Sequence, residues 1–494
     1  MLTPGSVIDL SIEKPAAGGR MIARHEGLVV LVSAAVPGER VRALVERTGQ
    51  GVAYATTVEV LEASPDRRTG VADWACGGNV YAHVAYPRQL LLKGEVIADA
   101  LARIGRVTRG EPVPVTASPE RGYRMRARFH VRGHQLGFFR EGTHHLCDPA
   151  GTGQLLPETG SMLEAMTEVL QEGRLRGVTE IELAENIPGT ERALHLELDR
   201  PVTPAGLERM AALPTVVGVA ASFNPPEPAE RRVAGSRRGA RGGRGPAGTV
   251  GAGLRAGPSA ASPQAWRRTV TAGGAPCVLD TLPAAAPKLA PERTGLRGAS
   301  EGGEWPGSEQ QLTRPLASPV RLQHHAEAFF QGNRFLLPAL AATVRSLVPP
   351  GPVVDLYAGV GLFAVTLAAS GSESVVAVES DRAAAADLRA NAAPFGDTLQ
   401  PVEMAVERYL ATHPAGRDVT IVVDPPRTGM SKEAAAAIAG QEAGRLVYVS
   451  CDVATFARDT RRLLDAGYAL DHLQAFDLFP NTAHVEVVAG FVRP

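Results

Sequence analysis

Long apolar runs are missing from this 494-residue chain, in which no stretch approaches the roughly eighteen consecutive apolar residues of a membrane span. The start, MLTPGSVIDL, has no basic segment followed by an apolar one, so we expect no secretory signal. Cysteine is scarce, and Cys76, Cys147, Cys277 and Cys451 are too few and too scattered for a disulfide scaffold. These absences disfavour a membrane protein and a small disulfide-rich secreted protein, and they predict a protein of the reducing cytoplasm.

An excess of either charge is also lacking, because 51 Lys and Arg residues balance 52 Asp and Glu residues to a net charge of −1. This balance excludes a uniformly basic coat, although charge can be segregated along a chain. Residues 230–268 hold nine Arg, nine Gly, one Glu and no Lys, a local charge of +8 that leaves −9 for the rest. Since this stretch has few large apolar side chains, we predict a disordered insertion over 224–310. It could bind nucleic acid nonspecifically through its cations, or it could be inert.

The length predicts two to four domains, and the first, 1–66, is rich in short strands. Glycine-containing turns separate these strands. Several short strands in so short a segment are typical of a small closed barrel of the OB type, which commonly binds single-stranded nucleic acid. A β-domain that serves only for packing is an equally good interpretation of the pattern. The expected strands are Val7–Ile12, Leu28–Val32, Val41–Val45 and Ala53–Leu61.

Residues 67–223 are predicted to form a central mixed α/β domain that binds RNA, and one of its strands is distinctive. From Arg124 to Arg132, apolar residues alternate with cationic ones, so the two sets occupy opposite faces of the strand. A row of like charges is costly unless an anion faces it. This favours a strand that contacts phosphate, since Arg is suited to that contact. The alternative is a solvated outer face with acidic neighbours.

Residues 311–494 alternate between strand and helix patterns, which predicts a doubly wound parallel sheet. We therefore expect an α/β protein with a Rossmann-like last domain. The expected strands are Pro352–Leu356, Val375–Glu379, Val419–Asp424 and Arg445–Ser450, and the expected helices are Phe363–Ala369 and Arg382–Ala392.

A glycine-containing turn, Asp355–Gly361, follows the first of these strands, where open α/β sheets bind their ligands. It has only two glycines of a dinucleotide fingerprint, Gly359 and Gly361, while Glu379 ends the next strand. A carboxylate at that position can accept two hydrogen bonds from a ribose diol. The combination favours an adenosyl ligand without a pyrophosphate over the alternative of a tight turn beside an exposed glutamate.

Further side chains at the same edge are candidates for chemistry. Asp424 begins the segment Asp-Pro-Pro-Arg-Thr-Gly directly after a strand, and the two prolines fix the backbone there. Cys451 lies between a strand and a helix, so the helix N-terminus is expected to favour its thiolate. Glu486 and His484 would share one side of the closing strand Val485–Phe491, and either could act as a base.

Together these motifs resemble the RNA 5-methyluridine methyltransferase family, enzymes that use S-adenosylmethionine to methylate uracil C5 in tRNA and rRNA. In such a reaction a thiolate adds to uracil C6, C5 takes up the methyl group, and a carboxylate removes the C5 proton. The first 66 residues are similar to the TRAM domain of these enzymes. The resemblance implies four cofactor-binding residues, a nucleophile and a base, which are in that order Gln331, Tyr357, Glu379, Asp424, Cys451 and Glu486. The matching segments are Phe329–Asn333, Asp355–Gly361, Asp424–Gly429, Ser450–Asp452, Asp477–Pro480 and His484–Glu486.

Many TRAM-bearing relatives hold a [4Fe–4S] cluster on four cysteines, and this chain keeps only two of the corresponding positions. Cys76 and Cys147 match, whereas Gly70 and Asn79 occupy the flanking ligand positions. Two thiolates cannot provide the usual four-cysteine ligation. We therefore predict that the chain holds no cluster and no other metal.

The leading hypothesis is a monomeric, cytoplasmic enzyme that methylates uridine C5 in structured RNA and does not associate with membranes. The resemblance of the barrel favours rRNA over tRNA. An RNA amino-group methyltransferase is one alternative, although Arg427 stands where such enzymes have an aromatic residue. A noncatalytic RNA-binding factor on the same fold is the other, which the presence of both Cys451 and Glu486 disfavours.

Overall fold

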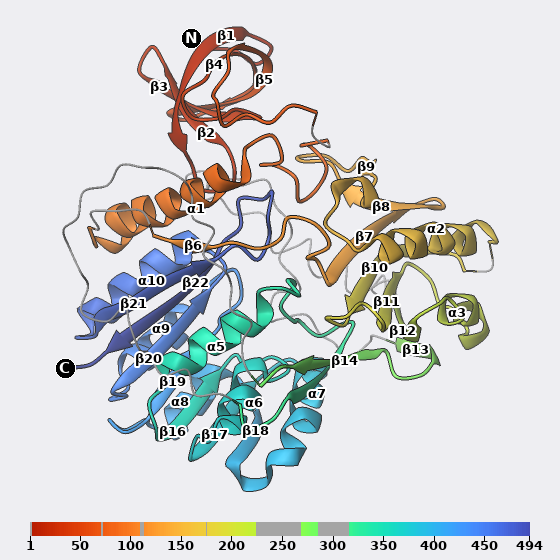
Figure 1. Ribbon diagram of the computed structural model, residues 1–494, viewed down its shortest axis with the longest axis vertical. Helices are drawn as coiled ribbons and strands as arrows, with labels where there is room; N and C mark the ends of the chain where they lie inside the picture. Colours follow the sequence, from red (N-terminus) through yellow and green to blue (C-terminus); the bar gives the residue numbers. More distant parts are fainter. Residues whose placement is uncertain (1, 71–72, 109–112, 174, 224–267, 285–315) are drawn as a thin grey trace, which may run out of the picture.

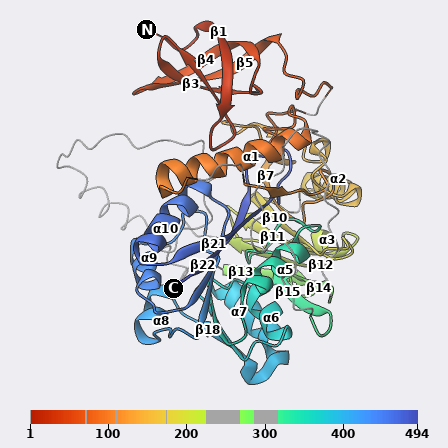
Figure 2. The same cartoon turned by 60° about the vertical axis from the view of Figure 1, so that its left-hand side comes forward.

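The structure, a computed structural model, describes residues 2–70, 73–108, 113–173, 175–223, 268–284 and 316–494 (Figure 1). An N-terminal barrel lies at one end of the molecule, and a central α/β unit and a larger sheet lie below it. Both Figure 1 and Figure 2 place α1 (Tyr86–Ala100) between the barrel and the larger sheet. Within the described ranges, no helix is long and apolar enough to cross a membrane.

Five strands close the N-terminal barrel in the order β1-β2-β3-β5-β4, which confirms the predicted OB-type fold. Inward-facing residues of different strands, such as Val30, Val41 and Ala53, are fully buried. The second strand was not predicted, and it follows the turn glycines Gly18 and Gly19. The strands are β1 (Val7–Pro15), β2 (Met21–His25), β3 (Leu28–Ser33), β4 (Arg40–Gly49) and β5 (Val52–Glu62).

A seven-stranded sheet forms the central unit, in the order β13-β12-β11-β10-β7-β8-β9. Phe129, Ile181 and Leu194 of its strands form a core with residues of two helices, α2 (Pro157–Gln171) and α3 (Pro204–Ala211). The short 3₁₀ helix η2 (Ala150–Thr152) precedes α2. The strands are β7 (Arg126–Arg132), β8 (Gln135–Phe139), β9 (Leu146–Cys147), β10 (Val178–Glu185), β11 (Arg192–Leu198), β12 (Val216–Phe223) and β13 (Arg268–Gly273).

The cationic side of β7 is not a free row of charges. Arg126 donates from Nη1 to the backbone carbonyl of His325 at 2.9 Å, so this guanidinium is used inside the protein. Arg128 forms ion pairs with Glu180 and Glu182 of the neighbouring strand β10. The prediction of a phosphate-facing strand is therefore wrong for Arg126 and Arg128, and for Arg128 the acidic neighbours of the alternative interpretation are present.

Part of the predicted insertion is folded. β13 pairs with β12, and β14 (Cys277–Leu282) pairs with β15 (Val320–His325). Asp280 of β14 is fully buried and hydrogen-bonded to His324 Nε2 at 2.9 Å. The prediction of disorder over 224–310 is therefore wrong for 268–284, and the other residues of that range lie outside those that the structure describes.

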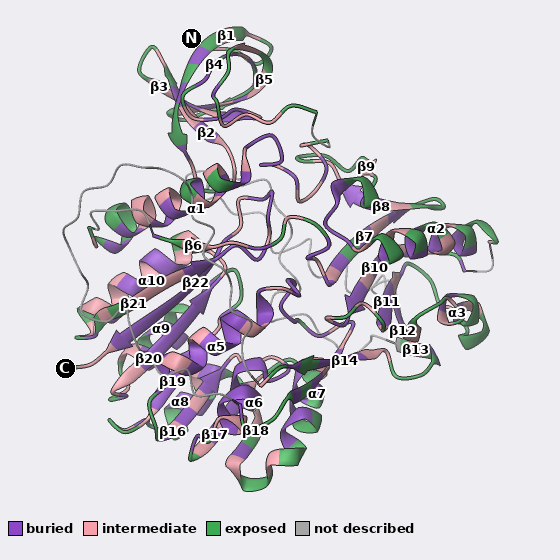
Figure 3. Cartoon of the chain, in the orientation of Figure 1, coloured by how far each residue is buried: buried purple, intermediate pink, exposed green. Residues whose placement is uncertain are grey.

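The C-terminal half is built around an eight-stranded sheet with the strand order β18-β17-β16-β19-β20-β22-β21-β6. The strands from β16 to β20 are parallel, which confirms the predicted Rossmann-like sheet, and β22 is antiparallel to β20. Its central strands are buried, as expected where helices cover both faces (Figure 3). The strands are β16 (Pro352–Leu356), β17 (Ser374–Glu379), β18 (Leu399–Glu403), β19 (Thr420–Val423), β20 (Arg445–Ser450), β21 (Ala469–Phe476) and β22 (Glu486–Val492). The helices are α5 (Leu337–Leu347), α6 (Leu362–Ala369), α7 (Arg382–Ala392), η4 (Ala393–Thr398), α8 (Val406–Thr412), α9 (Lys432–Ala439) and α10 (Val453–Asp465).

Two elements of the predicted central domain belong instead to the C-terminal sheet. β6 (Val115–Thr116) is its edge strand beside β21, and α1 packs against α10. Ile97 of α1 and Leu101 of the following π-helical turn η1 (Leu101–Gly105) are buried in the core of this sheet. The prediction of one central unit over 67–223 is therefore wrong for 86–105 and 115–116. A two-residue strand such as β6 has no periodicity that could reveal it.

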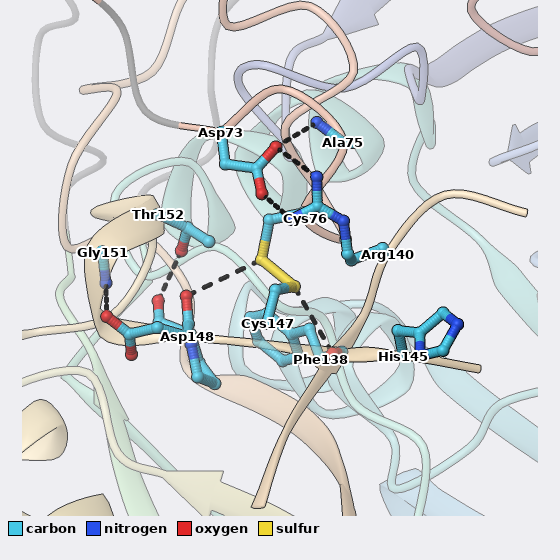
Figure 4. The surroundings of a disulfide bond; sticks show 12 residues. Asp73, Ala75, Cys76, Phe138, Arg140, His145, Cys147, Asp148, Gly151 and Thr152 are labelled. Atoms are coloured by element: carbon cyan, nitrogen blue, oxygen red, sulfur yellow. Dashed lines mark hydrogen bonds and ion pairs between the residues drawn. A yellow bond between two sulfur atoms is a disulfide. The ribbon is translucent and has the colours of Figure 1, made fainter. Parts of the chain in front are cut away.

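Cys76 and Cys147 form a disulfide that closes a sequence separation of 71 residues (Figure 4). Their Cα atoms are 5.7 Å apart, and the bridge ties the segment after the barrel to β9. Arg140 and Asp73 form an ion pair beside it. The scarcity of cysteine argued only against a disulfide scaffold, and this single bridge was not predicted. Two thiols that are bonded to each other do not fit the ligation of an iron–sulfur cluster.

Candidate active site at the carboxyl edge of the C-terminal sheet

The carboxyl ends of four parallel strands gather the candidate residues at one edge of the C-terminal sheet. Leu356 at the end of β16 is paired with Val378 on one side and with Val423 of β19 on the other. Tyr357 and Asp424 therefore leave the sheet from adjacent strands. Open α/β sheets bind their ligands at this edge. The four strands β16, β17, β19 and β20 end at Leu356, Glu379, Val423 and Ser450.

The turn after β16 allows a ligand to approach the backbone closely. Tyr357 has a left-handed φ of 61°, which is costly for a residue with a bulky side chain and is typical of functional turns. Gly359 has a φ of 57°, and a Cβ atom added to it would meet no atom within 4 Å. Open space therefore lies over this glycine, as a cofactor turn requires.

The Glu379 carboxylate is oriented by three backbone N–H groups. Oε2 accepts from Gly359 N–H at 2.9 Å, and Oε1 accepts from Ser380 and Asp381 N–H, both at 2.6 Å. Burial raises the pKa of Glu379, and these three donors act in the opposite direction. The carboxylate is thus fixed beside the turn, in a position from which it can accept hydrogen bonds from a diol.

Asp355 is a member of this site that the sequence analysis did not single out as a candidate. It is fully buried, its Oδ2 accepts from Ala364 N–H of α6 at 3.0 Å, and its Oδ1 has no hydrogen-bond partner among the residues that the structure describes. Burial, together with Asp424, raises the pKa of Asp355 well above its ordinary value. A carboxylate inside a buried apolar strand was the signal in the sequence that could have identified it.

Gln331 and Asp424 come together from distant parts of the chain. Gln331 Nε2 donates to Asp424 Oδ2 at 3.5 Å, and Gln331 is 6 % exposed. Asn333, two residues later, fixes this segment by donating from Nδ2 to Ser118 Oγ at 2.8 Å and to the carbonyl of Leu478 at 3.0 Å. Burial raises the pKa of Asp424 to about 7.

Cys451 and Glu486 lie near each other at the ends of two neighbouring strands. The pairing of β20 with β22 ends at Ser450 and Val487, Cys451 follows Ser450, and Glu486 is the first residue of β22. Burial and the Glu486 and Asp424 carboxylates raise the pKa of the Cys451 thiol. Burial and Asp424 likewise raise the pKa of Glu486 well above its ordinary value. In the free protein these surroundings favour the neutral thiol, and the effect of the helix N-terminus on Cys451 stays a prediction.

His484 is placed differently from the sequence expectation. β22 begins at Glu486, so His484 lies in the preceding hairpin loop and does not share a strand face with that residue. Burial and the cations of Arg427 and Lys93 lower the pKa of His484 to about 3. Its ring lies edge-on to Phe479, with the centroids 6.1 Å apart.

Comparison with known protein families agrees with this architecture. The family of tRNA (uracil-5-)-methyltransferases matches residues 340–492, and the TRAM domain matches residues 2–58. The 23S rRNA (uracil(1939)-C(5))-methyltransferase of Pseudomonas putida is 30% identical over 503 residues, which cover 98% of this chain and 93% of that protein. An uncharacterized RNA methyltransferase of Thermosynechococcus vestitus is 28% identical over 98% of both chains.

A solved structure extends the similarity to the fold of the whole chain. The tRNA (uracil-54, C5)-methyltransferase of Pyrococcus abyssi, crystallised with S-adenosyl-L-homocysteine, superposes with a TM-score of 0.67 at 21% identity. The superposition covers 98% of this chain and 99% of that one. The protein therefore belongs to the RNA uracil-C5 methyltransferases, a family of S-adenosylmethionine-dependent enzymes.

Proposed function

We propose that this chain transfers a methyl group from S-adenosylmethionine to C5 of a uridine in rRNA through a covalent bond between Cys451 and the base. The proposal is supported by the pairing of β20 with β22, at whose end Cys451 follows Ser450 and Glu486 precedes Val487. We favour rRNA over tRNA because the Pseudomonas relative, which is 30% identical, is named for 23S rRNA. The resemblance to the Pyrococcus tRNA enzyme rests on fold, at 21% identity.

Four residues at the sheet edge are proposed to hold S-adenosylmethionine, which supplies an electrophilic methyl group. The open space over Gly359 fits a ligand that approaches the backbone of this turn. The fixed carboxylate of Glu379 suits the ribose hydroxyls. The four residues are Gln331, Tyr357, Glu379 and Asp424.

Cys451 is proposed to form a bond from Sγ to uracil C6, which makes C5 nucleophilic enough to take up the methyl group. Glu486 then accepts the C5 proton, the C5–C6 double bond re-forms, and the bond between Cys451 and C6 breaks. Arg427 lowers the pKa of the Cys451 thiol and so favours the ionisation that must precede attack. The target base has to be unpaired or flipped out to reach a thiol at this depth.

The test uses the purified full-length chain, S-adenosylmethionine and an unmodified 23S rRNA transcript. Mass spectrometry of digested nucleosides should find 5-methyluridine with the wild type and none with Cys451→Ala. A 5-fluorouridine transcript should give a covalent complex that survives denaturing electrophoresis, because fluorine at C5 cannot leave as a proton. A product methylated on an exocyclic amino group, still formed by Cys451→Ser, would overturn the proposal in favour of an amino-group methyltransferase.

A further inference from the structure

The loop of the β21–β22 hairpin, residues 477–485, leads directly to Glu486. It leaves the sheet after Phe476 and returns at Glu486, and these two residues are paired. Phe479 of the loop contacts the active-site segment, because a Cβ atom on Gly332, next to Gln331, would be 3.1 Å from its ring. A displacement of this hairpin loop would therefore act first on Glu486, the proposed base, which follows the loop directly.

Lys93 of α1 forms a buried ion pair with the first residue of the hairpin loop. Its Nζ donates to Asp477 Oδ1 at 2.5 Å and to the carbonyl of Phe479 at 3.2 Å. The Lys93 and Asp477 side chains are 1 % and 0 % exposed. A desolvated charge pair adds little net stability, but it can specify one geometry, since shifted arrangements leave a buried charge unpaired.

Gln89, one helical turn before Lys93, holds the middle of the same loop. Its Nε2 donates to Asn481 Oδ1 at 2.9 Å, and its Oε1 accepts from Asn481 N–H at 2.9 Å. Asn481 has a left-handed φ of 62°, so the loop backbone turns at the residue to which Gln89 is hydrogen-bonded. Residues four apart on a helix point the same way, and this face of α1 is turned to the loop.

Groups from outside the C-terminal domain also contact the hairpin loop. Tyr123 donates from its hydroxyl to the carbonyl of Pro480 at 3.2 Å, and Tyr81 N–H donates to the carbonyl of Asn481 at 2.8 Å. At the barrel, a Cβ atom on Gly19 would be 3.3 Å from Ala483. The hairpin loop is thus held by parts of the chain that precede the methyltransferase sheet.

We propose that Gln89 and Lys93 are positioning residues for proton abstraction, which fix the hairpin loop in its position beside Glu486. The inference rests on the proposed function, in which Glu486 accepts the C5 proton. Neither residue touches the reacting atoms. If the loop is loosened, addition and methyl transfer at Cys451 should continue, while the step that depends on Glu486 slows and the covalent intermediate accumulates.

The experiment compares Gln89→Met, which removes the amide bonds without leaving a charge, with Arg88→Met as the matched control. Arg88 lies on the same helix and pairs with Glu95 at 2.8 Å, away from the loop. A second test variant, Lys93→Met combined with Asp477→Asn, removes the ion pair without leaving a buried charge. The full-length chain is incubated with the unmodified 23S rRNA transcript and labelled S-adenosylmethionine, and denaturing electrophoresis separates the RNA adduct from released product.

In both test variants the fraction of enzyme that is covalently bound to methylated RNA should be about tenfold higher than in the wild type and in Arg88→Met. This increase is expected when a general base is weakened. The rate of methyl incorporation in a single turnover and the affinity for S-adenosylmethionine should stay near wild type. A proportional fall of methyl transfer and adduct would overturn the inference, because that is what a merely structural role predicts. Unchanged adduct levels, or loss of folding in both variants, would overturn it as well.

Failure of the proposed function is recognised separately in the wild type. If the wild-type chain forms no Cys451-dependent complex with the 5-fluorouridine transcript, the covalent mechanism itself is wrong. If it forms that complex while Gln89→Met accumulates no adduct on the uridine transcript, only the positioning role is wrong.

Discussion

The side chains of Gln331 and Asp424, 93 residues apart in the sequence, meet in a hydrogen bond of 3.5 Å at the carboxyl edge of the C-terminal sheet. The contact joins the segment before α5 to the end of β19. Burial raises the pKa of Asp424 to about 7, while the hydrogen bond from Gln331 lowers it. The charge at this position therefore changes near neutral pH, and a cationic ligand would favour the ionised form.

The raised pKa of Asp424 predicts how stability depends on pH. A carboxyl group with a higher pKa in the folded chain than in the unfolded chain binds more protons when folded, so its ionisation destabilises the fold as pH rises. For Asp424 this loss of stability should develop between pH 3.8 and about pH 7, and it should be complete at higher pH. The side chain of Asp424→Asn carries no charge, so the variant should not lose stability in this way. The free energy of unfolding of the variant minus that of the wild type should therefore increase as the pH rises through this range. Urea unfolding at about pH 5 and about pH 8 measures the difference.

The control for this measurement is Asp397→Asn, which removes an exposed carboxylate. Its effect should be small at both pH values, since exposed charges interact weakly. If Asp424→Asn differed from wild type by the same amount at both pH values, the carboxyl group would not titrate in that window.

The proposed roles of Cys451 as nucleophile and Glu486 as base predict a trapped intermediate. Glu486→Gln keeps the size of the side chain but removes its basicity, so turnover should fall by about 10²–10⁴-fold. The enzyme should remain bonded to methylated RNA through Cys451, and a slow band in denaturing electrophoresis should disappear in the Cys451→Ala background. Normal turnover of Glu486→Gln without this band would assign the base to another group, and His484 would be the next candidate to test.

Local patterns in the sequence predicted the elements that carry the site. The helix Arg382–Ala392 and the strand Arg445–Ser450 have the predicted bounds, because buried strands and the caps of helices leave continuous signals. The sites of Asp424 and Cys451 directly follow strands as expected. Their proposed roles came from the resemblance to a family, and they remain predictions.

Features that depend on long-range packing could not be predicted. β6 pairs with β21 across more than 350 residues, and nothing in its two residues indicates this partner. The Arg-rich stretch concealed β13 and β14, because composition averaged over 224–310 masks short strands within it. The raised pKa of Cys451 also results from tertiary contacts, since burial and the Glu486 carboxylate cause it and neither follows from the local sequence.

The disulfide between Cys76 and Cys147 predicts how many thiols react before and after reduction. Without reductant, the unfolded chain should show two reactive thiols, those of Cys277 and Cys451, and after reduction it should show four. Protein purified anaerobically should contain iron near zero and show no broad visible absorption. About four irons per chain would contradict this prediction.

Loss of the bridge should also lower stability. Replacing Cys76 and Cys147 by serine frees a loop of 71 residues in the unfolded chain, and loop-closure entropy predicts a cost of about 4 kcal/mol. Denaturant unfolding without reductant measures it, and Cys277→Ser is the control. If reductant destabilised the wild type no more than it destabilises the double variant, the bridge would not form in solution.

Substitution of the turn glycine Gly361 separates the cost of a strained backbone from the cost of steric overlap. Gly361 has a φ of 97°, and a Cβ atom there would lie 2.7 Å from Leu388 Cδ1 of α7. Gly371 has a similar φ of 87°, but a Cβ atom would meet nothing within 4 Å. Both Gly361→Ala and Gly371→Ala should therefore lose about 1–2 kcal/mol through the left-handed backbone, and only Gly361→Ala should lose about 1–3 kcal/mol more through overpacking.

The same pair of variants tests whether the turn holds the cofactor. A Cβ atom at Gly361 requires Leu388 or the turn itself to shift, so Gly361→Ala should bind S-adenosylmethionine more weakly. Gly371, after α6, lies outside the turn, and its variant should bind with wild-type affinity. Isothermal titration with S-adenosylmethionine measures both, at a temperature where each variant is folded. Equal affinities in the two variants would mean that the turn after β16 does not contact the cofactor.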